Sequence, residues 1–392
     1  MSPLDRTRLK EALALAEASI GVTEPNPRVG CVIGSEDGRV FGRGGTQQAG
    51  GPHAEVMALR DADAAGFDVR GATAWVTLEP WAHHGRTPPC CDALIAAGLG
   101  RVVAALEDPF PQVAGRGTAR LRAAGIRVDA AEAELSAAAW DLNIGFFSRT
   151  LRSRPWVRLK SAASLDGRTA LPNGQSQWIT SAAARADGHA WRHRASAVLS
   201  GIGTVLADNP RLDVREVPAR HQPLRIVVDS KLRTPTAARL LDPPGRVLLV
   251  HAQGCDELGA ADALMQRGAE LLSLPSTLSG IDLVALLAEL ARRGVNELHV
   301  EAGPTLSGVL LRAGLVDEVL LYVAPSLIGP GRAIADWPAL AALDERVSLE
   351  WHDSLRVGAD LRLRLRSAAG VAFAAAWRAP APLPVPLPTT PS

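Results

Sequence analysis

Two short segments of the chain combine the residue types of a catalytic zinc site. His53-Ala54-Glu55 is followed by Pro80-Trp81 and then by Cys90, and zinc deaminases use an H-x-E segment and a P-C…C segment. In such sites the histidine and two cysteines bind the ion, and the glutamate transfers protons without ligating it. Here Trp81 stands at the first of the two cysteine positions. An indole offers an N–H donor and no lone pair for a metal, so one ligand is missing.

The missing ligand bears directly on catalysis. A catalytic zinc takes three protein ligands and a water, whose pKa it lowers to about 7. Glu55 would take a proton from that water and pass it to the leaving ammonia. Because His53 and Cys90 are the two ligands left, we expect deamination to be absent or severely reduced. Zn²⁺ is expected as a cofactor only if this site functions.

Two alternatives stay open for the N-terminal half. His83, two residues beyond Trp81, or another group could complete the zinc shell and keep the deaminase active; His84 is a further version of the same idea. The N-terminal domain could instead be only a binding or assembly module. Cys91 adjoins Cys90, but neighbours on a helix point roughly 100° apart, so we expect Cys91 to be a core residue.

The composition predicts a two-domain cytoplasmic enzyme. The chain has 392 residues, 47% of them hydrophobic, and a formal net charge of +1. It has no basic run, so we expect no nucleic-acid partner. The four cysteines do not form the pattern of a disulfide framework, and reduced thiols favour the cytoplasm. The first ten residues lack the apolar core of a signal peptide, and no run of about 18 apolar residues predicts a membrane span.

Strands that alternate with helices predict an α/β layered domain over residues 1–147. Its helices are expected at residues 4–20, 55–65, 89–97 and 118–124. Its strands are expected at residues 28–33, 39–44, 73–78, 101–106 and 126–128, with residues 35–38 as a hairpin turn. Three arginines and a proline place a linker at residues 148–155.

A second alternation predicts another α/β domain over residues 156–367. Its strands are expected at residues 156–160, 197–200, 224–228, 247–250, 297–301 and 318–324, and its helices at residues 182–194, 256–267, 283–293 and 305–313. Residues 368–392 are rich in proline and alanine. We expect this tail to be disordered, because it cannot bury enough surface to offset its ordering entropy.

Several longer motifs resemble the riboflavin-biosynthesis deaminase/reductase family. They occupy residues 25–31, 49–55, 77–80, 83–90, 159–168, 176–180, 203–210 and 301–306, and the resemblance spans about residues 5–366. It implies a cytidine-deaminase-like α/β/α layered domain followed by a dihydrofolate-reductase-like α/β domain. The family's first domain deaminates a phosphoribosylamino-pyrimidine. Its second domain reduces the ribosyl group of 5-amino-6-(5-phosphoribosylamino)uracil to a ribityl chain with NADPH, and homo-oligomers are usual.

In the first domain, the resemblance implies zinc ligands at positions 53, 81 and 90. It also implies contacts to a phosphoribosylated pyrimidine from Asn26, His83, Arg86 and Thr87. The Arg86 guanidinium could fork onto the substrate phosphate. Two neighbouring positions depart from the family: Thr46 replaces a usual histidine that meets the substrate, and Gly45 replaces a usual aromatic.

In the second domain, the core motifs show no departure from the family. The implied NADPH contacts are Ala162, Trp178, Thr204, Asp208, Ser230, Gly303, Pro304, Thr305, Leu306, Ser307 and Gly308. The implied substrate contacts are Ser176, Arg192, Leu212, Arg215 and Glu301.

The residue types of the second domain agree with those roles. Arg192 and Arg215 can hold a phosphate as planar forks, and Glu301 can accept hydrogen bonds from sugar hydroxyls or ring amines. The turn that opens at Gly303 follows a predicted strand and begins a helix, whose N–H groups favour a phosphate; a simple strand–helix turn is the competing interpretation. Lys160 or Asp166 could assist proton transfer, although Asp166 fits turn chemistry equally and Trp178 could be core packing.

Overall fold

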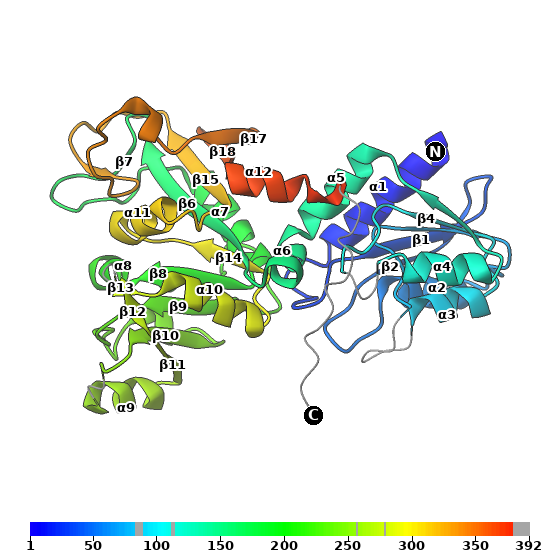
Figure 1. Ribbon diagram of the computed structural model, residues 1–392, viewed down its shortest axis with the longest axis horizontal. Helices are drawn as coiled ribbons and strands as arrows, with labels where there is room; N and C mark the ends of the chain where they lie inside the picture. The colour runs from blue at the N-terminus through cyan, green and yellow to red at the C-terminus, as the bar shows by residue number, and fades with distance from the viewer. Residues whose placement is uncertain (83–88, 111–113, 256–257, 278–279, 379–392) are drawn as a thin grey trace, which may run out of the picture. The chain divides into compact units, whose positions relative to one another are not determined.

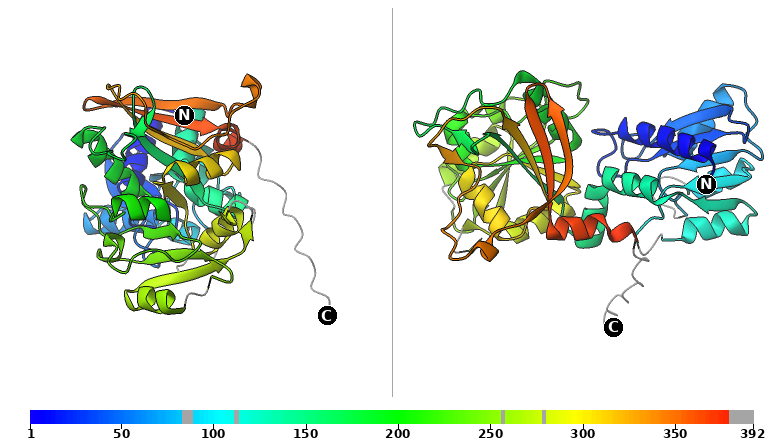
Figure 2. Two further views of the ribbon diagram at one scale, coloured as in Figure 1. Left: turned by 90° about the vertical axis from the view of Figure 1, so that its left-hand side faces the viewer. Right: turned by 90° about the horizontal axis from the view of Figure 1, so that it is seen from above.

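The computed structural model describes residues 1–82, 89–110, 114–255, 258–277 and 280–378. They form two compact units, one of residues 1–152 together with the chain from Ala374 onward, and one of residues 153–373. Figure 1 shows each unit as a sheet with helices packed against it, and Figure 2 gives two further views. Among the described residues, no helix combines the length and apolar character needed to cross a membrane.

The first unit is built on a mixed five-stranded sheet within the described residues, in the order β2-β1-β3-β4-β5. β1 pairs antiparallel with β2 and β3, whereas β3, β4 and β5 are parallel. All residues of β1 and β3 are buried, as expected for strands with helices on both faces. The strands are β1 (Gly30–Gly34), β2 (Val40–Gly45), β3 (Thr73–Val76), β4 (Arg101–Ala104) and β5 (Arg127–Ala130), and the helices are α1 (Pro3–Glu17), α2 (Ala54–Ala64), α3 (Cys90–Ala96), α4 (Arg116–Ala123), α5 (Ala133–Leu142) and α6 (Ile144–Arg152).

Glycines let α1 and α2 approach opposite faces of this sheet. A Cβ on Gly30 would lie 1.9 Å from the Ala12 carbonyl oxygen of α1, and a Cβ on Gly44 would lie 2.1 Å from the Ala54 carbonyl oxygen of α2. Side chains are excluded at both positions, because such distances are far below van der Waals contact. This close packing fixes the first turn of α2, which carries His53 as its N-cap and Glu55.

Helices α5 and α6 were not predicted from the sequence. They hold in place the loop that precedes β1. Trp140 of α5 stacks on Phe147 of α6, with ring centroids 4.4 Å apart. Between the helices, the Asn143 side chain accepts a hydrogen bond from the Arg28 N–H (2.7 Å) and donates one to the Arg28 carbonyl (2.9 Å). This pair of bonds anchors the segment that follows Asn26.

The second unit contains a nine-stranded sheet within the described residues, in the order β11-β10-β9-β8-β14-β6-β15-β18-β17. The strands are parallel from β11 to β15, and β18 and β17 add an antiparallel edge. They are β6 (Trp156–Ser164), β8 (Ala197–Gly201), β9 (Leu224–Val228), β10 (Val247–Ala252), β11 (Ala269–Leu274), β14 (Glu297–Val300), β15 (Glu318–Ala324), β17 (Leu349–Val357) and β18 (Asp360–Ser367).

The helices of the second unit are α7 (Ala182–Arg194), α8 (Ile202–Asp208), α9 (Leu258–Gln266), α10 (Leu283–Arg292), α11 (Pro304–Arg312) and α12 (Ala368–Ala374). Three single 3-10 turns and two short ribbons complete the described elements: η1 (Arg239–Leu241), η2 (Leu343–Glu345) and η3 (Ala376–Arg378), with β7 (Arg168–Ala170) paired to β16 (Arg332–Ala333) and β12 (Ser276–Thr277) paired to β13 (Gly280–Ile281). The predictions for α7, β9 and β15 are confirmed at both ends.

A ladder of buried charges lies between α7 and this sheet. Arg158 of β6, which has no exposed side-chain surface, donates to Glu318 (2.6 Å) and to Glu297 (2.8 Å). Its guanidinium also lies 4.4 Å from the centre of the Trp191 ring on α7. Residues two apart on a strand point to the same face, so Lys160 continues the ladder toward the carboxyl end of β6. This edge of a parallel sheet is where ligands bind in α/β folds.

The structure corrects the predicted linker and tail. Residues 148–152, predicted as linker, belong to α6, because Phe146, Phe147 and Ser148 are buried and continue the helix. The helix ends before Ser153, whose φ of 53° breaks it two residues ahead of Pro155. Residues 368–378, predicted as disordered, form α12 and η3, because the Phe373 ring packs 6.1 Å from the Trp156 ring. The rest of the predicted tail lies outside the described residues.

Candidate active sites

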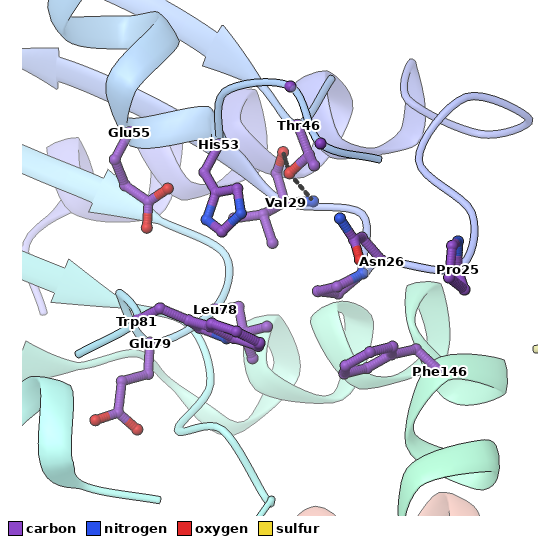
Figure 3. Close-up of a pocket in the computed structure, with 13 residues that line it drawn as sticks. Pro25, Asn26, Val29, Thr46, His53, Glu55, Leu78, Glu79, Trp81 and Phe146 are labelled. Carbon is purple, nitrogen blue, oxygen red and sulfur yellow. Dashed lines mark hydrogen bonds between the residues drawn. The ribbon is translucent and has the colours of Figure 1, made fainter. Parts of the chain in front are cut away.

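The first unit contains a cavity of ≈ 270 Å³ that brings together several residues of the predicted deaminase site. Its lining includes Asn26, Thr46, His53, Glu55 and Trp81, together with Phe146 of α6. Figure 3 shows these side chains converging from the loop before β1, the start of α2 and the segment after β3. His83, Arg86 and Thr87, and the alternative His84, lie outside the described residues.

His53 and Glu55, which line this pocket, could hold one metal ion together with the neighbouring Cys90. His53 Nδ1 lies 3.1 Å from Cys90 Sγ, and one ligand atom of each of His53, Glu55 and Cys90 lies within 4.8 Å of the others. The starts of α2 and α3 supply all three. Burial and the nearby Glu55 carboxylate raise the pKa of the Cys90 thiol, so a cation is needed to favour its thiolate. Burial likewise raises the pKa of Glu55.

Trp81 forms part of the pocket wall and offers nothing to a metal. Its Nε1–H donates to Asp108 Oδ2 (3.2 Å), and its ring meets His53 edge to face with centroids 6.1 Å apart. Figure 3 shows the indole extending below His53. Burial raises the pKa of Asp108 to about 6, and the indole N–H is one of the groups that oppose this shift. Sequence reasoning missed Asp108, because no local pattern links it to Trp81.

Neighbouring groups have structural roles. The Glu79 carboxylate accepts hydrogen bonds from the N–H groups of Asp108, Gly115 and Thr118. These bonds tie Glu79 to the residues after β4 and to the start of α4. Cys91 is buried and its thiol donates to the Pro80 carbonyl (2.9 Å), which confirms its predicted place in the core.

The two family departures near this pocket differ in position. Thr46 lines the pocket, but its hydroxyl accepts a hydrogen bond from the Val29 N–H (3.2 Å). Gly45 faces α1 instead, since a Cβ there would lie 3.1 Å from the Leu15 carbonyl oxygen. Thr46 and Trp81 therefore share this pocket, whereas alternation along β2 turns Gly45 to the other side of the sheet.

The second unit contains a cleft of ≈ 290 Å³ lined by ten of the residues predicted for the reductase. They are Ala162, Ser176, Trp178, Arg192, Thr204, Asp208, Leu212, Glu301, Gly303 and Pro304. Lys160 joins them. The remaining predicted contacts are not part of the lining: Ser230, Thr305, Leu306, Ser307, Gly308 and Arg215. Thr305 donates to Asp336 (2.7 Å) and the exposed Arg215 pairs with Asp213 (2.9 Å).

Glu301 is the electrostatic centre of this cleft. Arg192 binds its carboxylate with both Nε and Nη2, the latter at 2.8 Å, and His299 Nε2 lies 3.4 Å from it. Burial alone would raise the pKa of Glu301, but Arg192 and Lys160 hold it well below its usual range. Burial lowers the pKa of Lys160. Arg192 also donates to the Asp213 carbonyl. The guanidinium that was predicted to bind a phosphate is therefore hydrogen-bonded to groups of the protein itself.

Two open alternatives of the second unit are decided by position. Trp178 is 66% exposed, so it is not core packing, and the Arg185 guanidinium lies 4.1 Å from its ring centre. Asp166 accepts hydrogen bonds from the Ser164 hydroxyl (2.5 Å) and the Gly329 N–H (2.8 Å), which favours its role in the turn. Lys160 is thus the better placed of the two proton-transfer candidates.

Both halves of the chain match known families. Residues 3–106 match the cytidine and deoxycytidylate deaminase zinc-binding region, and residues 155–363 match the RibD C-terminal domain. The riboflavin biosynthesis protein RibD of Escherichia coli (strain K12) is 44% identical over 372 residues, covering 92% of this chain and 98% of that protein. This chain belongs to the RibD family. RibD of Aquifex aeolicus is 39% identical, with 91% and 97% covered.

Solved RibD structures have the same fold. Acinetobacter baumannii RibD (form 1) gives a TM-score of 0.81 at 38% identity, with 93% of this chain and 99% of that chain covered. A diaminohydroxyphosphoribosylaminopyrimidine deaminase/5-amino-6-(5-phosphoribosylamino)uracil reductase from Thermotoga maritima gives 0.81 at 31% identity, again with 93% and 99% covered. The predicted fold class and the assignment to riboflavin biosynthesis are confirmed. Because the matches span both domains, they favour the bifunctional alternative over the expectation of an inactive first domain.

Proposed function

We propose that this RibD-family chain acts on phosphoribosylated pyrimidines in two steps. The first unit releases ammonia from the diaminopyrimidine, and the second reduces the ribosyl group of 5-amino-6-(5-phosphoribosylamino)uracil with NADPH. The observation that carries the second step is the cluster of Lys160 on β6, Arg192 on α7 and Glu301 directly after β14. That cluster combines a half-buried acid with positively charged groups for a polar substrate.

The cleft of the second unit fits a nicotinamide dinucleotide. Trp178 offers an exposed ring face, α11 begins at the cleft with Gly303 as its N-cap, and Arg185 and Arg332 supply positive charge for phosphates. When bound there, NADPH would supply the hydride. Glu301 would orient the sugar through its hydroxyls, and Lys160 Nζ would deliver the proton to the ring oxygen that opens. Burial prepares Lys160 for this role, because its lowered pKa eases proton release.

The pocket of the first unit fits zinc through His53 and Cys90, whose donor atoms already lie 3.1 Å apart. Zinc would supply a hydroxide at neutral pH. Asn26 and the Phe146 ring, on the opposite side of the pocket in Figure 3, would orient the pyrimidine. Glu55 lies where a carboxylate could accept the proton released there.

The test measures each half-reaction on the purified full chain. NADPH oxidation is followed at its absorbance band with the deaminated substrate, and ammonia release is followed with the diaminopyrimidine. We expect rapid NADPH oxidation that Lys160→Met abolishes, and slower ammonia release. No oxidation by the unmodified chain would refute the reductase step, and no ammonia release by zinc-loaded protein would refute the deaminase step.

A further inference from the structure

The pocket of the first unit contains a third donor in reach of His53 and Cys90. Among the described residues, the group able to hold a metal consists of His53, Glu55 and Cys90. Glu55 is 3% exposed and sits in the first turn of α2, directly beyond the N-cap His53. Its position is set by the same close packing of α2 on β2 that sets His53.

Among the described residues that line the pocket, His53 is the one that can carry a positive charge beside this buried carboxylate. The described residues that line it include neither lysine nor arginine. A buried carboxylate is costly unless it is paired or coordinates a metal, and a metal shared with His53 and Cys90 would compensate its charge. In the second unit, side chains of the chain itself compensate the negative charge of Glu301, because Arg192 and Lys160 flank its carboxylate.

We propose that Glu55 coordinates the zinc ion as the third protein ligand, in place of the cysteine that Trp81 replaces. This inference rests on the proposed zinc-dependent function of the pocket. Imidazole, thiolate and carboxylate are all zinc ligands, with bond lengths of about 2.0–2.3 Å. Tetrahedral binding then requires ligand atoms about 3.3–3.8 Å apart, so the observed limit of 4.8 Å must close by at most about 1.5 Å. The three rotatable bonds of a glutamate side chain allow that movement.

Coordination changes the role of Glu55 in the chemistry. In zinc deaminases the corresponding glutamate transfers protons and does not ligate. A carboxylate that ligates through one oxygen keeps a second oxygen able to accept a proton, but its basicity falls because the cation withdraws its charge. The site therefore retains zinc and deaminates more slowly than a site with a third ligand at position 81.

The decisive measurement is zinc affinity in two backgrounds, by chelator competition and elemental analysis of the full chain. In the native chain, Glu55→Gln should weaken zinc binding at least 100-fold, because it removes one of three ligands. In the Trp81→Cys background, the same Glu55→Gln change should leave zinc bound, because the thiolate replaces the carboxylate. Glu107→Gln, an exposed carboxylate of the same unit, is the matched control and should change nothing.

Cobalt substitution gives a second readout that does not depend on turnover. Cys90 bound to Co²⁺ should give a thiolate charge-transfer band in the native chain, lost in Glu55→Gln and regained in the double variant. Equal zinc affinity of the native chain and Glu55→Gln would overturn the proposal, and so would absence of zinc from the native chain. Zinc held through Glu55 without ammonia release would leave the coordination standing and refute only the deaminase step.

Discussion

The two pockets of this RibD-family chain differ in what compensates the charge of a carboxylate, which is the buried Glu55 in the first unit and the half-buried Glu301 in the second. In the second unit, Glu301 is neutralised by Arg192 and Lys160, above a ladder that continues through Arg158. In the first unit, Glu55 has His53 and Cys90 as neighbours and no lysine or arginine among the described lining residues. The carboxylate of the second cleft is thus compensated by side chains of the chain itself, whereas we propose that a bound zinc ion compensates Glu55 in the first pocket. Substitutions that disturb this balance should have different consequences in each unit.

The largest effect is expected from Glu301→Gln. Removing one partner from a buried charge pair costs about 3–5 kcal/mol, and if this pair loses as much in transition-state binding, kcat/KM of the reductase falls by roughly 10²–10⁴-fold. Arg192 and Lys160 would be left without their counter-charge. NADPH oxidation measures the loss, and ammonia release should be unchanged. Glu350→Gln, an exposed carboxylate on β17, is the control. A loss below tenfold would mean that the cleft is not organised around Glu301.

Trp81→Cys should raise the deaminase activity of the first unit, whereas Glu301→Gln lowers the reductase activity of the second. A second thiolate, as the third ligand, would release Glu55 for proton transfer, and a positioned general base contributes about 10²–10⁴-fold. We therefore expect ammonia release to rise about 100-fold, with NADPH oxidation unaltered. If ammonia release stays the same, Thr46 becomes the residue to change next, since it lines the same pocket.

The pH dependence of stability should have opposite signs in the two units. Burial raises the pKa of Asp108 to about 6, so the folded first unit binds the extra proton and loses about 3 kcal/mol as pH rises from about 4 to 6. Burial, Arg192 and Arg215 lower the pKa of His189 to about 4, so the second unit gains about 3 kcal/mol from pH 4 to 6.5. Urea unfolding of Asp108→Asn and His189→Gln at several pH values isolates each contribution. Equal slopes in both variants would contradict the difference.

The smallest effect is expected from Trp81→Phe. This change removes the hydrogen bond to Asp108 and should cost the first unit about 1–2 kcal/mol of unfolding free energy. Zinc affinity should be unaltered, because the indole lines the pocket and does not bind the metal. A drop in zinc affinity would show that the tryptophan positions the metal-binding groups.

The sequence predicted elements best where periodicity and burial agree. Helix α7 and strands β9 and β15 have the predicted ends because their apolar residues face a core. Strand β18 was missed although it alternates strictly, because its polarity is inverted: Arg366 is 7% exposed and Leu361 is 48% exposed. The arginines face the buried ladder, where Arg364 pairs with Glu318 (2.9 Å). Local pattern cannot reveal that a charged face is the inner one.

In the two sites as well, the residues that belong to motifs were predicted, whereas contacts between residues distant in the sequence were missed. The H-x-E and P-C motifs predicted that His53, Glu55 and Cys90 lie together, and the family resemblance predicted ten of the residues that line one cleft. The partner of Trp81 and the pairing of Arg192 with Glu301 were missed, because they join residues 27 and 109 positions apart. Such contacts depend on the sheet order, which one sequence does not specify.

The enclosed Arg158 ladder also determines how the protein responds to ionic strength. Mobile ions screen exposed charges within about 10 Å at 0.1 M salt, but they cannot enter a fully enclosed pair. Arg158 and Glu318 have no exposed side-chain surface, whereas Arg6 and Glu132 on the first unit are 51% and 41% exposed. Concentrated salt should therefore weaken exposed ion pairs such as Arg6–Glu132. The enclosed Arg158–Glu318 pair beneath the reductase cleft should remain intact.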